Sequence, residues 1–436
     1  MKIWRVLATV ILTLFLTISF VLPAEAFCGF YVAKADTNLY NQASQVIIAK
    51  DGARTILTMA NDYKGEVKNF ALVVPVPVVL DEEQVRIGET KIIQRLDAFS
   101  APRLVEYFDE NPCQIRDRGF VLESAPAPAA GAPRARREDE SLGVTVEASF
   151  SVGEYDIVIL SARESSGLET WLINNGYKIP RGAKDLLQPY IRQNMKFFVA
   201  KVNLEEFESS GFQSLRPLMI AYEDPRFMLP IRLGMTNAEG EQDLIVYLLS
   251  PKGQVEVTNY RTAKIPSNVE IPEFVEEEFA DFYKAMFKTA YNQENKRVAF
   301  LEYAWDMSWC DPCAADPLSA EELKQAGVFW LVPGQPQNVF LSRIHVRYTR
   351  NTFPEDLRFQ ETANKQNFQG RYVIRHPYKG EMECDAAEQY KTVLRQRQEQ
   401  EVETLAKLTG WNIRDIRKKA DLVETRPLPW WRRIWN

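Results

Sequence analysis

Two of the cysteines stand close enough in the chain to carry out thiol chemistry together. They are Cys310 and Cys313, which follow Trp309 and are separated by Asp311 and Pro312. A pair with this spacing can exchange two thiols for a disulfide, with Cys310 as the nucleophile and Cys313 as the resolving thiol. Thiol-disulfide oxidoreductase is therefore the enzymatic alternative that the sequence offers.

The segment from Trp309 to Cys313 resembles the Trp-Cys-x-Pro-Cys active site of thioredoxin-like proteins, but its surroundings do not. A thioredoxin-type helix begins at the first cysteine, where the positive helix N-terminus stabilises the thiolate. Here Pro317 follows the pair, and the capping box at 319–322 starts the helix later. Nearby aspartates would raise a cysteine pKa rather than lower it. We therefore interpret the pair as a local structural disulfide and predict no catalytic residue.

A metal site is the other chemistry to weigh. Cys310, Cys313, His376 and Cys384 have the ligand types of a Cys₃His zinc site. The long spacings between them match no zinc signature, so we predict no metal and no cofactor. The chain also has neither a Gly-x-x-x-x-Gly-Lys phosphate loop nor a Gly-x-Ser-x-Gly nucleophile elbow.

The chain has 2 histidines, and neither is expected to act in catalysis. His345 lies between Arg343 and Arg347 in a strand-like segment, where every second side chain points to the same side. Three basic side chains on one side predict a solvated face. His376 precedes Pro377 and is expected at the surface.

The first 26 residues have the pattern of a secretory signal peptide. Lys2 and Arg5 form a positive start, an apolar run covers 6–22, and small residues at 24 and 26 offer a cleavage site before Phe27. The run is 17 residues long, at the short end for a membrane span of about 20. An uncleaved N-terminal anchor is the alternative. We predict an exported protein of the periplasm, the cell envelope or the medium.

Export would place the cysteines in an oxidising compartment, where thiols are expected to pair. Cys28 and Cys113 are the two cysteines of the N-terminal portion, and we predict that they join. Cys310 is predicted to pair with Cys313, which leaves Cys384 as a free thiol. In the competing arrangement Cys384 joins Cys310 or Cys313 and ties the last long helix to that loop.

Composition limits the classes of partner. The formal net charge is −6 and the chain has no dense basic patch, so nucleic acid is not expected. The 46% of apolar residues indicates a large packed interior. At the C-terminus, Trp430, Trp431 and Trp435 accompany Arg432 and Arg433, a combination that suits contact with a membrane surface. Docking of this tail on its own domain is the alternative.

The order of elements predicts an α+β fold that is rich in antiparallel sheet and has several packed helices. Asp51-Gly52 between two apolar runs predicts a hairpin. Closely spaced strand-like runs over 218–262 predict an antiparallel meander. We divide the mature chain into an N-terminal α+β region, 27–204, and a C-terminal α+β region, 205–436. The low-complexity segment 124–140 is predicted to be a disordered loop within the first region.

Three helical patterns are prominent. Segment 90–108 has helical spacing, with a break expected at Pro102. Over about 272–292 apolar residues recur on one face, which predicts a core helix. Segment 385–409 predicts a long final helix that ends at Gly410. Because 395–401 is entirely polar, this part is expected to lie along the surface.

Several segments spread over the mature chain carry a family resemblance. They are Cys28-Gly29-Phe30-Tyr31-Val32, Val74-Pro75-Val76-Pro77, Gly153-Glu154-Tyr155-Asp156, Tyr303-Ala304-Trp305 with the Cys-Asp-Pro-Cys loop, Arg343-Ile344-His345-Val346-Arg347-Tyr348, and Leu408-Thr409-Gly410-Trp411. Together they resemble an uncharacterised family of exported bacterial proteins, domain-of-unknown-function family 2330. The resemblance implies an envelope or secreted location and a shared fold, without an activity. We therefore predict a non-enzymatic binding or envelope-associated module with an unknown envelope or extracellular partner.

Overall fold

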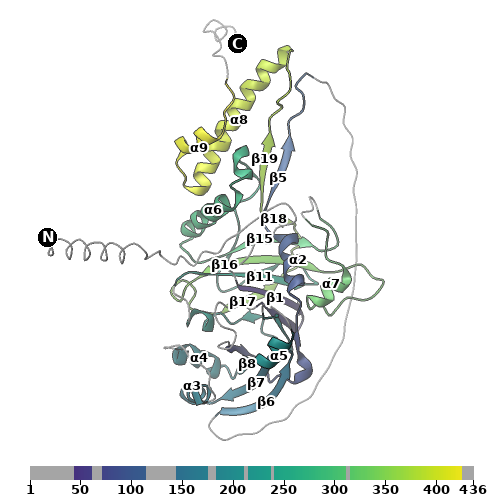
Figure 1. Ribbon diagram of the computed structural model, residues 1–436, viewed down its shortest axis with the longest axis vertical. Helices are drawn as coiled ribbons and strands as arrows, with labels where there is room; N and C mark the ends of the chain where they lie inside the picture. Colours follow the sequence, from purple (N-terminus) through teal and green to yellow (C-terminus); the bar gives the residue numbers. More distant parts are fainter. Residues whose placement is uncertain are drawn as a thin grey trace, which may run out of the picture.

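The computed structural model describes residues 44–60, 71–113, 144–174, 183–210, 215–236, 240–310 and 315–424. These residues form an α+β molecule, as predicted, with a long axis that runs through three tiers (Figure 1). The predicted signal peptide, the loop 124–140, two of the cysteines and the tail tryptophans lie outside the described residues (Cys28, Cys313, Trp430, Trp431 and Trp435).

A mixed nine-stranded sheet forms the middle tier (Figure 1). Its strands, in spatial order, are β13 (Arg261–Lys264), β15 (Val298–Asp306), β16 (Phe340–Tyr348), β11 (Gln242–Ser250), β1 (Ser44–Asp51), β2 (Arg54–Met59), β9 (Leu218–Glu223) and β4 (Val85–Ile87), with β18 (Phe368–Gln369) paired to β15. β1 pairs in parallel with β11 and antiparallel with β2. Strands from both sides of residue 204 thus share one sheet and one hydrophobic core.

The hairpin predicted from a local turn is present, whereas the predicted order of strand pairing is not. The hairpin predicted at Asp51-Gly52 is confirmed, because β1 and β2 pair up to Asp51 and Arg54, and Gly52 has the left-handed φ of 59° that the turn requires. The predicted meander is wrong. β9 lies between β2 and β4, whereas β11 lies between β1 and β16. Consecutive strands therefore pair with distant parts of the chain.

The lower tier is an antiparallel sheet covered by short helices (Figure 1). Its strands, in spatial order, are β3 (Ala71–Val76), β8 (Lys196–Val202), β7 (Tyr155–Ala162) and β6 (Val144–Val152). The helices of this tier are α3 (Ser165–Asn174), α4 (Ala183–Arg192) and α5 (Leu204–Ser210). A second hydrophobic cluster fills the space between this sheet and the helices α3 and α4.

Several small elements complete the fold. β10 (Met228–Leu229), β17 (Leu357–Glu361) and β12 (Val255–Val257) form a three-stranded sheet. The short helices are η2 (Glu82–Gln84), η3 (Leu233–Thr236) and α7 (Ala320–Gln325). α7 begins at the predicted capping box, where the Ser319 side chain accepts from the Glu322 backbone.

The upper tier, called the arm below, projects beyond the central sheet (Figure 1). It comprises a parallel sheet of β14 (Val269–Glu270), β19 (Arg371–His376) and β5 (Arg103–Phe108), together with η4 (Glu273–Glu276), α8 (Asp385–Thr409) and α9 (Ile413–Lys419). α2 (Thr90–Ser100) precedes β5. The predicted break at Pro102 is therefore confirmed, but the chain continues as a strand and not as a second helix. Among the residues that the structure describes, β5 pairs only with β19 and is an edge strand of its sheet.

Both predicted long helices are present. α6 (Phe279–Gln293) follows η4 and buries its apolar face, as expected from the spacing. α8 ends at Gly410, which has φ 73°. The expectation that 395–401 lies along the surface is wrong in part, because Gln398 and Glu401 are buried. α8 packs against α6 and β14, and the polar residues of this turn are enclosed by neighbours that the local sequence does not reveal.

Candidate functional site

The buried face of β16 carries the ionisable residues that most resemble a catalytic site. Arg343, His345 and Arg347 do share one side of the strand, as the alternation predicted. The face is not solvated, however, because α2 and α6 cover it. The His345 side chain is 0% exposed and stacks on Phe287 of α6, with ring centroids 4.1 Å apart. The prediction of a solvated histidine is therefore wrong.

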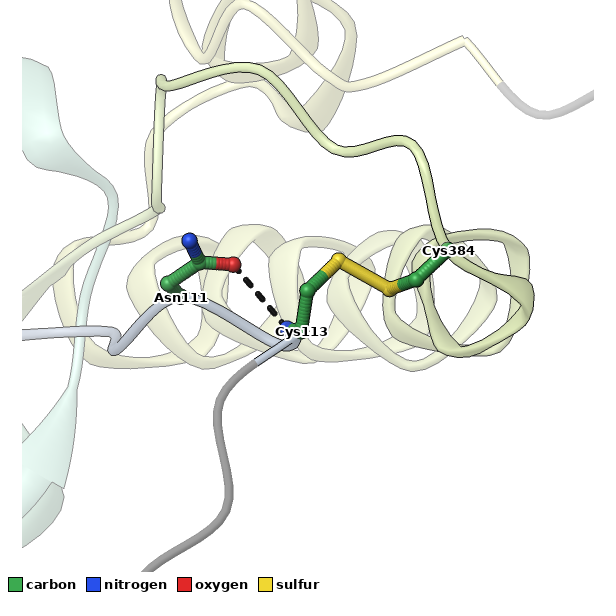
Figure 2. Close-up of a disulfide and its surroundings, with 3 residues drawn as sticks. All are labelled: Asn111, Cys113 and Cys384. Carbon is green, nitrogen blue, oxygen red and sulfur yellow. Dashed lines mark hydrogen bonds between the residues drawn. A yellow bond between two sulfur atoms is a disulfide. The ribbon is translucent and has the colours of Figure 1, made fainter.

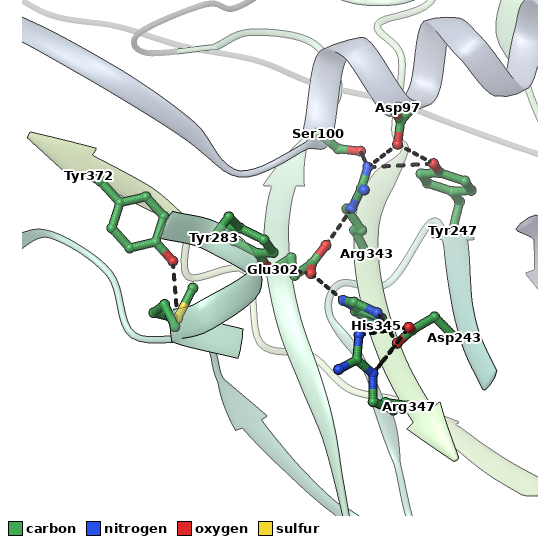
Figure 3. A network of polar contacts seen from close by, with 11 residues as sticks. Asp97, Ser100, Asp243, Tyr247, Tyr283, Glu302, Arg343, His345, Arg347 and Tyr372 are labelled. Atoms are coloured by element: carbon green, nitrogen blue, oxygen red, sulfur yellow. Dashed lines mark hydrogen bonds and ion pairs between the residues drawn. The ribbon is translucent and has the colours of Figure 1, made fainter. Parts of the chain in front are cut away.

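Acidic and basic side chains alternate along this face (Figure 3). The contacts, in order, are Asp97 Oδ1 to Arg343 Nη1 at 2.6 Å, Arg343 Nε to Glu302 Oε2 at 2.7 Å, Glu302 Oε1 to His345 Nδ1 at 2.8 Å, His345 Nε2 to Asp243 Oδ1 at 2.8 Å, and Asp243 Oδ2 to Arg347 Nη2 at 2.8 Å. This set of six residues is called the charge chain below. Each buried ion faces ions of the opposite sign, which is the condition for keeping charges out of water.

Glu302 occupies the centre of the charge chain because β15 has a bulge there. The pairing of β15 with β16 skips between Leu301 and Tyr303, so Glu302 is the extra residue of the bulge. The Tyr283 hydroxyl of α6 also donates to Glu302, at 2.6 Å. At the other end, the Tyr247 hydroxyl donates to Asp97 at 2.7 Å. Two helices and three strands thus fix the positions of these groups.

The electrostatics favour the charged forms at the centre of the charge chain. Burial by itself would lower the pKa of His345, but Glu302 and Asp243 outweigh it and hold this pKa above its usual value. Burial opposes ionisation of Glu302, yet His345 and Arg343 hold its pKa below the usual range. At the Asp97 end of the charge chain, burial dominates and raises the pKa of Asp97 despite the nearby Arg343. Both ring nitrogens of His345 thus face a carboxylate oxygen at 2.8 Å, an arrangement that favours the protonated imidazole.

The centre of the charge chain is enclosed, and this decides what it can do. Arg343 and His345 are 0% exposed, so their ring and guanidinium atoms have no contact with solvent or with a ligand from outside. We interpret the charge chain as a structural network that fixes the register between the sheet, α2 and α6. Sequence reasoning did not single out Glu302, although a lone glutamate within the apolar run of β15 was a usable signal.

The described cysteines are joined across the chain. Cys113 and Cys384 form a disulfide with an S–S distance of 2.05 Å and a sequence separation of 271 (Figure 2). The predicted Cys28–Cys113 pair and the free thiol at Cys384 are therefore wrong, as is the competing link from Cys384 to Cys310 or Cys313. The physical reason is the parallel pairing of β5 with β19. Because the two strands run in the same direction, the segment after β5, which contains Cys113, lies beside the segment after β19, which contains Cys384 and leads into α8.

The Cys-x-x-Cys loop is only partly within the described residues. Cys310 is disulfide-bonded, and it is partly buried against the main core. Cys313 lies outside the described residues, so the predicted Cys310–Cys313 pair stays a prediction. Trp309 is 46% exposed and packs edge-on against Trp305, with ring centroids 4.9 Å apart. No observation on this loop favours redox catalysis.

The second histidine lies in an acidic corner of the arm. His376, at the end of β19, places Nδ1 2.9 Å from Glu273 and Nε2 3.2 Å from Glu106. Burial would lower the pKa of His376, but these hydrogen bonds hold it above the usual value. Phe108 stacks on the imidazole, with ring centroids 4.5 Å apart. The four-residue zinc set considered from the sequence is not assembled, because Cys384 is in a disulfide.

The outer edge of the arm exposes aromatic side chains. On the edge strand β5, Phe108 is 69% exposed and Tyr107 is 44% exposed. Adjacent residues of a strand point to opposite faces, so the two rings border both faces of the sheet at its free edge. Exposed aromatics at an unpaired strand edge are features of surfaces that bind other molecules. Among the described residues, no helix combines the length and apolar character needed to cross a membrane.

Comparisons with known proteins place the chain in a family but do not give it an activity. A comparison with curated proteins found no match. Two solved structures of a mutated baculovirus P35 after caspase cleavage align with a TM-score of 0.25 each and sequence identities of 11% and 10%. The alignments cover 49% and 50% of this chain, and 66% and 70% of those chains. A TM-score of this size does not indicate a shared fold.

The family comparison covers most of the chain. A family model described as "Uncharacterized protein conserved in bacteria (DUF2330)" matches residues 22–360. The match includes the lower tier, β5 and all strands of the central sheet except β18, and it ends before β19, His376 and α8. The family resemblance that the sequence motifs indicated is therefore confirmed: the chain belongs to the DUF2330 family of bacterial proteins.

Proposed function

We propose that this protein is an exported, non-enzymatic binding protein that works outside the bacterial cytoplasm. The observation that carries the proposal is the Cys113–Cys384 disulfide, which joins segments 271 residues apart. Cys310 is disulfide-bonded as well, so every cysteine among the described residues is oxidised. Disulfides of this kind persist in oxidising compartments and are rare in the cytosol. The N-terminal pattern of a signal peptide supports the same location.

The binding role is supported by where the reactive groups lie. His345 and its carboxylate partners are sealed inside the protein, away from any substrate. The accessible features are instead on the arm, where Phe108 and Tyr107 border the free edge of β5. An extended segment of an envelope or extracellular partner could add to such an edge by main-chain hydrogen bonds. We therefore assign binding to the arm and a supporting role to the central sheet.

Export is tested by producing the full chain in a bacterial host and separating the cell fractions. The N-terminal sequence of the exported protein should begin at Phe27, and Cys113 and Cys384 should resist alkylation until a reductant is added. A variant that lacks residues 2–26 is the control and should stay in the cytoplasm with reactive thiols. Recovery of the chain in the membrane fraction with Met1 intact would show that the N-terminal segment is kept as an anchor and is not cleaved. Reactive thiols in a cytoplasmic full-length chain would contradict the proposal.

Binding is tested by site-specific photo-crosslinking in intact cells. A crosslinking residue in place of Phe108 should capture an envelope component, and one in place of Ile173 on α3 should not. Ile173 is a matched control because it is also an exposed apolar residue, at 55%, and it lies in the lower tier. The same adducts at both positions, or none at Phe108, would contradict binding by the arm. If the wild-type protein reduced insulin and the Cys310→Ser variant did not, the oxidoreductase function would replace the proposed binding function.

A further inference from the structure

Three separate elements bring one imidazole and three carboxylates together in the arm. β5 and β19 pair in parallel with Ile374 opposite Glu106, so Glu106 and His376 lie on the same face of the sheet. η4 follows β14, which pairs with β19, and it contributes Glu273 and Glu276. Residues three apart in a 3₁₀-helix are eclipsed, and both glutamates therefore point to the same side. The cluster results from tertiary structure, since its members come from 106, 273, 276 and 376.

The imidazole of His376 is held in one orientation by its surroundings. Its Nδ1 lies 2.9 Å from Glu273 Oε1, and Lys379 Nζ lies 2.9 Å from the same carboxylate oxygen. Phe108 stacks on the ring at an interplanar angle of 14°. An Nδ1–H that donates to a carboxylate is the usual way in which proteins orient a metal-binding histidine. This contact leaves Nε2 as the nitrogen that faces Glu106.

Around Nε2 the donor atoms have the spacing of a coordination shell. The ligand atoms of His376, Glu106 and Glu276 all lie within 4.8 Å of one another, and Nε2 is 3.2 Å from Glu106 Oε2. Tetrahedral zinc with bonds of about 2.0–2.2 Å keeps its donor atoms about 3.3 Å apart. Binding of a metal would require the three donors to move from separations of up to 4.8 Å toward that distance. We propose that His376, Glu106 and Glu276 form a binding site for a divalent transition-metal ion, with Glu273 as the positioning residue behind His376.

The donor set selects the class of metal. One imidazole and two carboxylates suit Zn²⁺ and similar ions of intermediate softness. Ca²⁺ and Mg²⁺ prefer shells made of oxygen alone, so the imidazole disfavours them. Three protein ligands leave a coordination position for water or for a donor from a partner. The imidazole of His376, with Glu273 behind it, distinguishes this cluster from a group of acidic side chains alone.

The framework around the site is rigid, which favours binding. Glu106 and His376 are on paired strands, and the Cys113–Cys384 disulfide joins the segments that follow β5 and β19. Side chains on strands that are held in place by pairing and by a disulfide lose less conformational freedom when a metal binds. The proposed site is independent of the export and binding proposals above, because it depends only on the geometry of the arm.

The test uses the untagged mature chain with its disulfides intact, stripped of metal with a chelator and titrated with Zn²⁺ alone in a calorimeter. We expect one Zn²⁺ per chain. His376→Ala, Glu106→Gln and Glu276→Gln should each weaken binding by about tenfold or more, and Glu273→Gln by about tenfold, as for other positioning partners of metal-bound histidines. Excess Ca²⁺ or Mg²⁺ should not displace the Zn²⁺.

Glu270→Gln is the matched control, since Glu270 lies in the neighbouring strand β14 but pairs with Arg375. It should leave Zn²⁺ affinity unchanged. Circular dichroism of every variant separates loss of the site from loss of the fold. Cobalt substitution gives a second readout, because Co²⁺ bound through the imidazole has a visible spectrum that His376→Ala should alter. Absence of Zn²⁺ binding, or equal affinity in folded His376→Ala, would overturn the site.

Discussion

At the scale of single residues, the central feature is a row of alternating charges whose middle members, Arg343, Glu302 and His345, are 0% exposed. Arg343 contacts both Asp97 and Glu302, and its guanidinium is 0% exposed. Such a network contributes little net stability compared with an apolar core, but removing one member leaves its partners buried and unpaired. The groups that look most reactive in this protein are therefore the ones whose loss should damage the fold.

Replacing Arg343 with methionine should lower the free energy of unfolding by about 3–5 kcal/mol, because the carboxylates of Asp97 and Glu302 stay buried without their cation. Chemical denaturation followed by circular dichroism measures this loss. Arg54→Met is the control, since the Arg54–Glu223 pair is about a third exposed on each side. It should change stability by about 0–1 kcal/mol. Equal losses in the two variants would show that the charge chain has no special role.

At the scale of elements, the arm is built from pieces that local sequence does not connect. β5 follows α2 early in the chain, whereas β19 and α8 come near its end, and the Cys113–Cys384 disulfide fastens them together. α8 also encloses polar groups: Glu401 is buried beside Arg397, with Glu270 of β14 and Asp109 nearby. The arm therefore depends on one covalent link and on partly compensated buried charge.

Removal of the disulfide is expected to weaken the arm first. Cys113→Ser with Cys384→Ser should reduce stability by about 2–5 kcal/mol, because the link no longer restricts the unfolded chain. Limited proteolysis should then cut the segments around β5 and the start of α8 before it cuts the central sheet. Wild-type protein with and without reductant is the comparison. An unchanged cleavage pattern in the double variant would contradict this role.

Glu401 should make stability depend on pH. Burial raises its pKa from the usual 4.5 to about 7, although Arg397 opposes the shift. The folded state therefore holds the proton more tightly than the unfolded state. This contribution is fully present below about 4.5 and is lost as pH rises through about 7, up to about 3 kcal/mol.

Unfolding measured from pH 4 to pH 8 should show that decline in the wild type. Glu401→Gln stays neutral and should remove this part of it. Glu399→Gln is the matched control on the same helix, because Arg417 and Arg395 hold the pKa of Glu399 below its usual value. The Glu399→Gln protein should keep the decline between pH 4.5 and 7. The same decline in Glu401→Gln would assign it to another group.

At the scale of the whole molecule, the two halves of the chain share one sheet. β1, from the first half, lies between β2 and β11, and its pairing with β11 is parallel. One hydrophobic core contains residues from Val46 to Ile416. The arm is completed by β19 and α8, which lie beyond the residues that match the family model.

A fragment of residues 27–204 should therefore not fold alone. Without β11, β1 would expose buried side chains such as Ile47 and Ile48 on a sheet edge. Circular dichroism and a urea titration should show no cooperative transition in the fragment, in contrast to the mature chain. A cooperative transition in the fragment would show that the N-terminal region is an independent domain.

The sequence by itself determined the local elements and the family. Apolar spacing predicted α6, Gly410 marked the end of α8, and Asp51-Gly52 predicted the first hairpin. These features depend on neighbours within a few residues, where backbone geometry and side-chain spacing decide the outcome. The α+β class followed from the same local patterns.

Only the tertiary structure decided which distant residues meet. The Arg-His-Arg alternation around His345 showed a shared face, but whether α2 and α6 or water covers that face depends on packing. The same holds for Cys113 with Cys384, and for His376 with Glu106, which the parallel pairing of β5 and β19 brings together. Strand pairing across hundreds of residues leaves no periodic trace in the local sequence, because any exposed strand edge offers the same backbone groups.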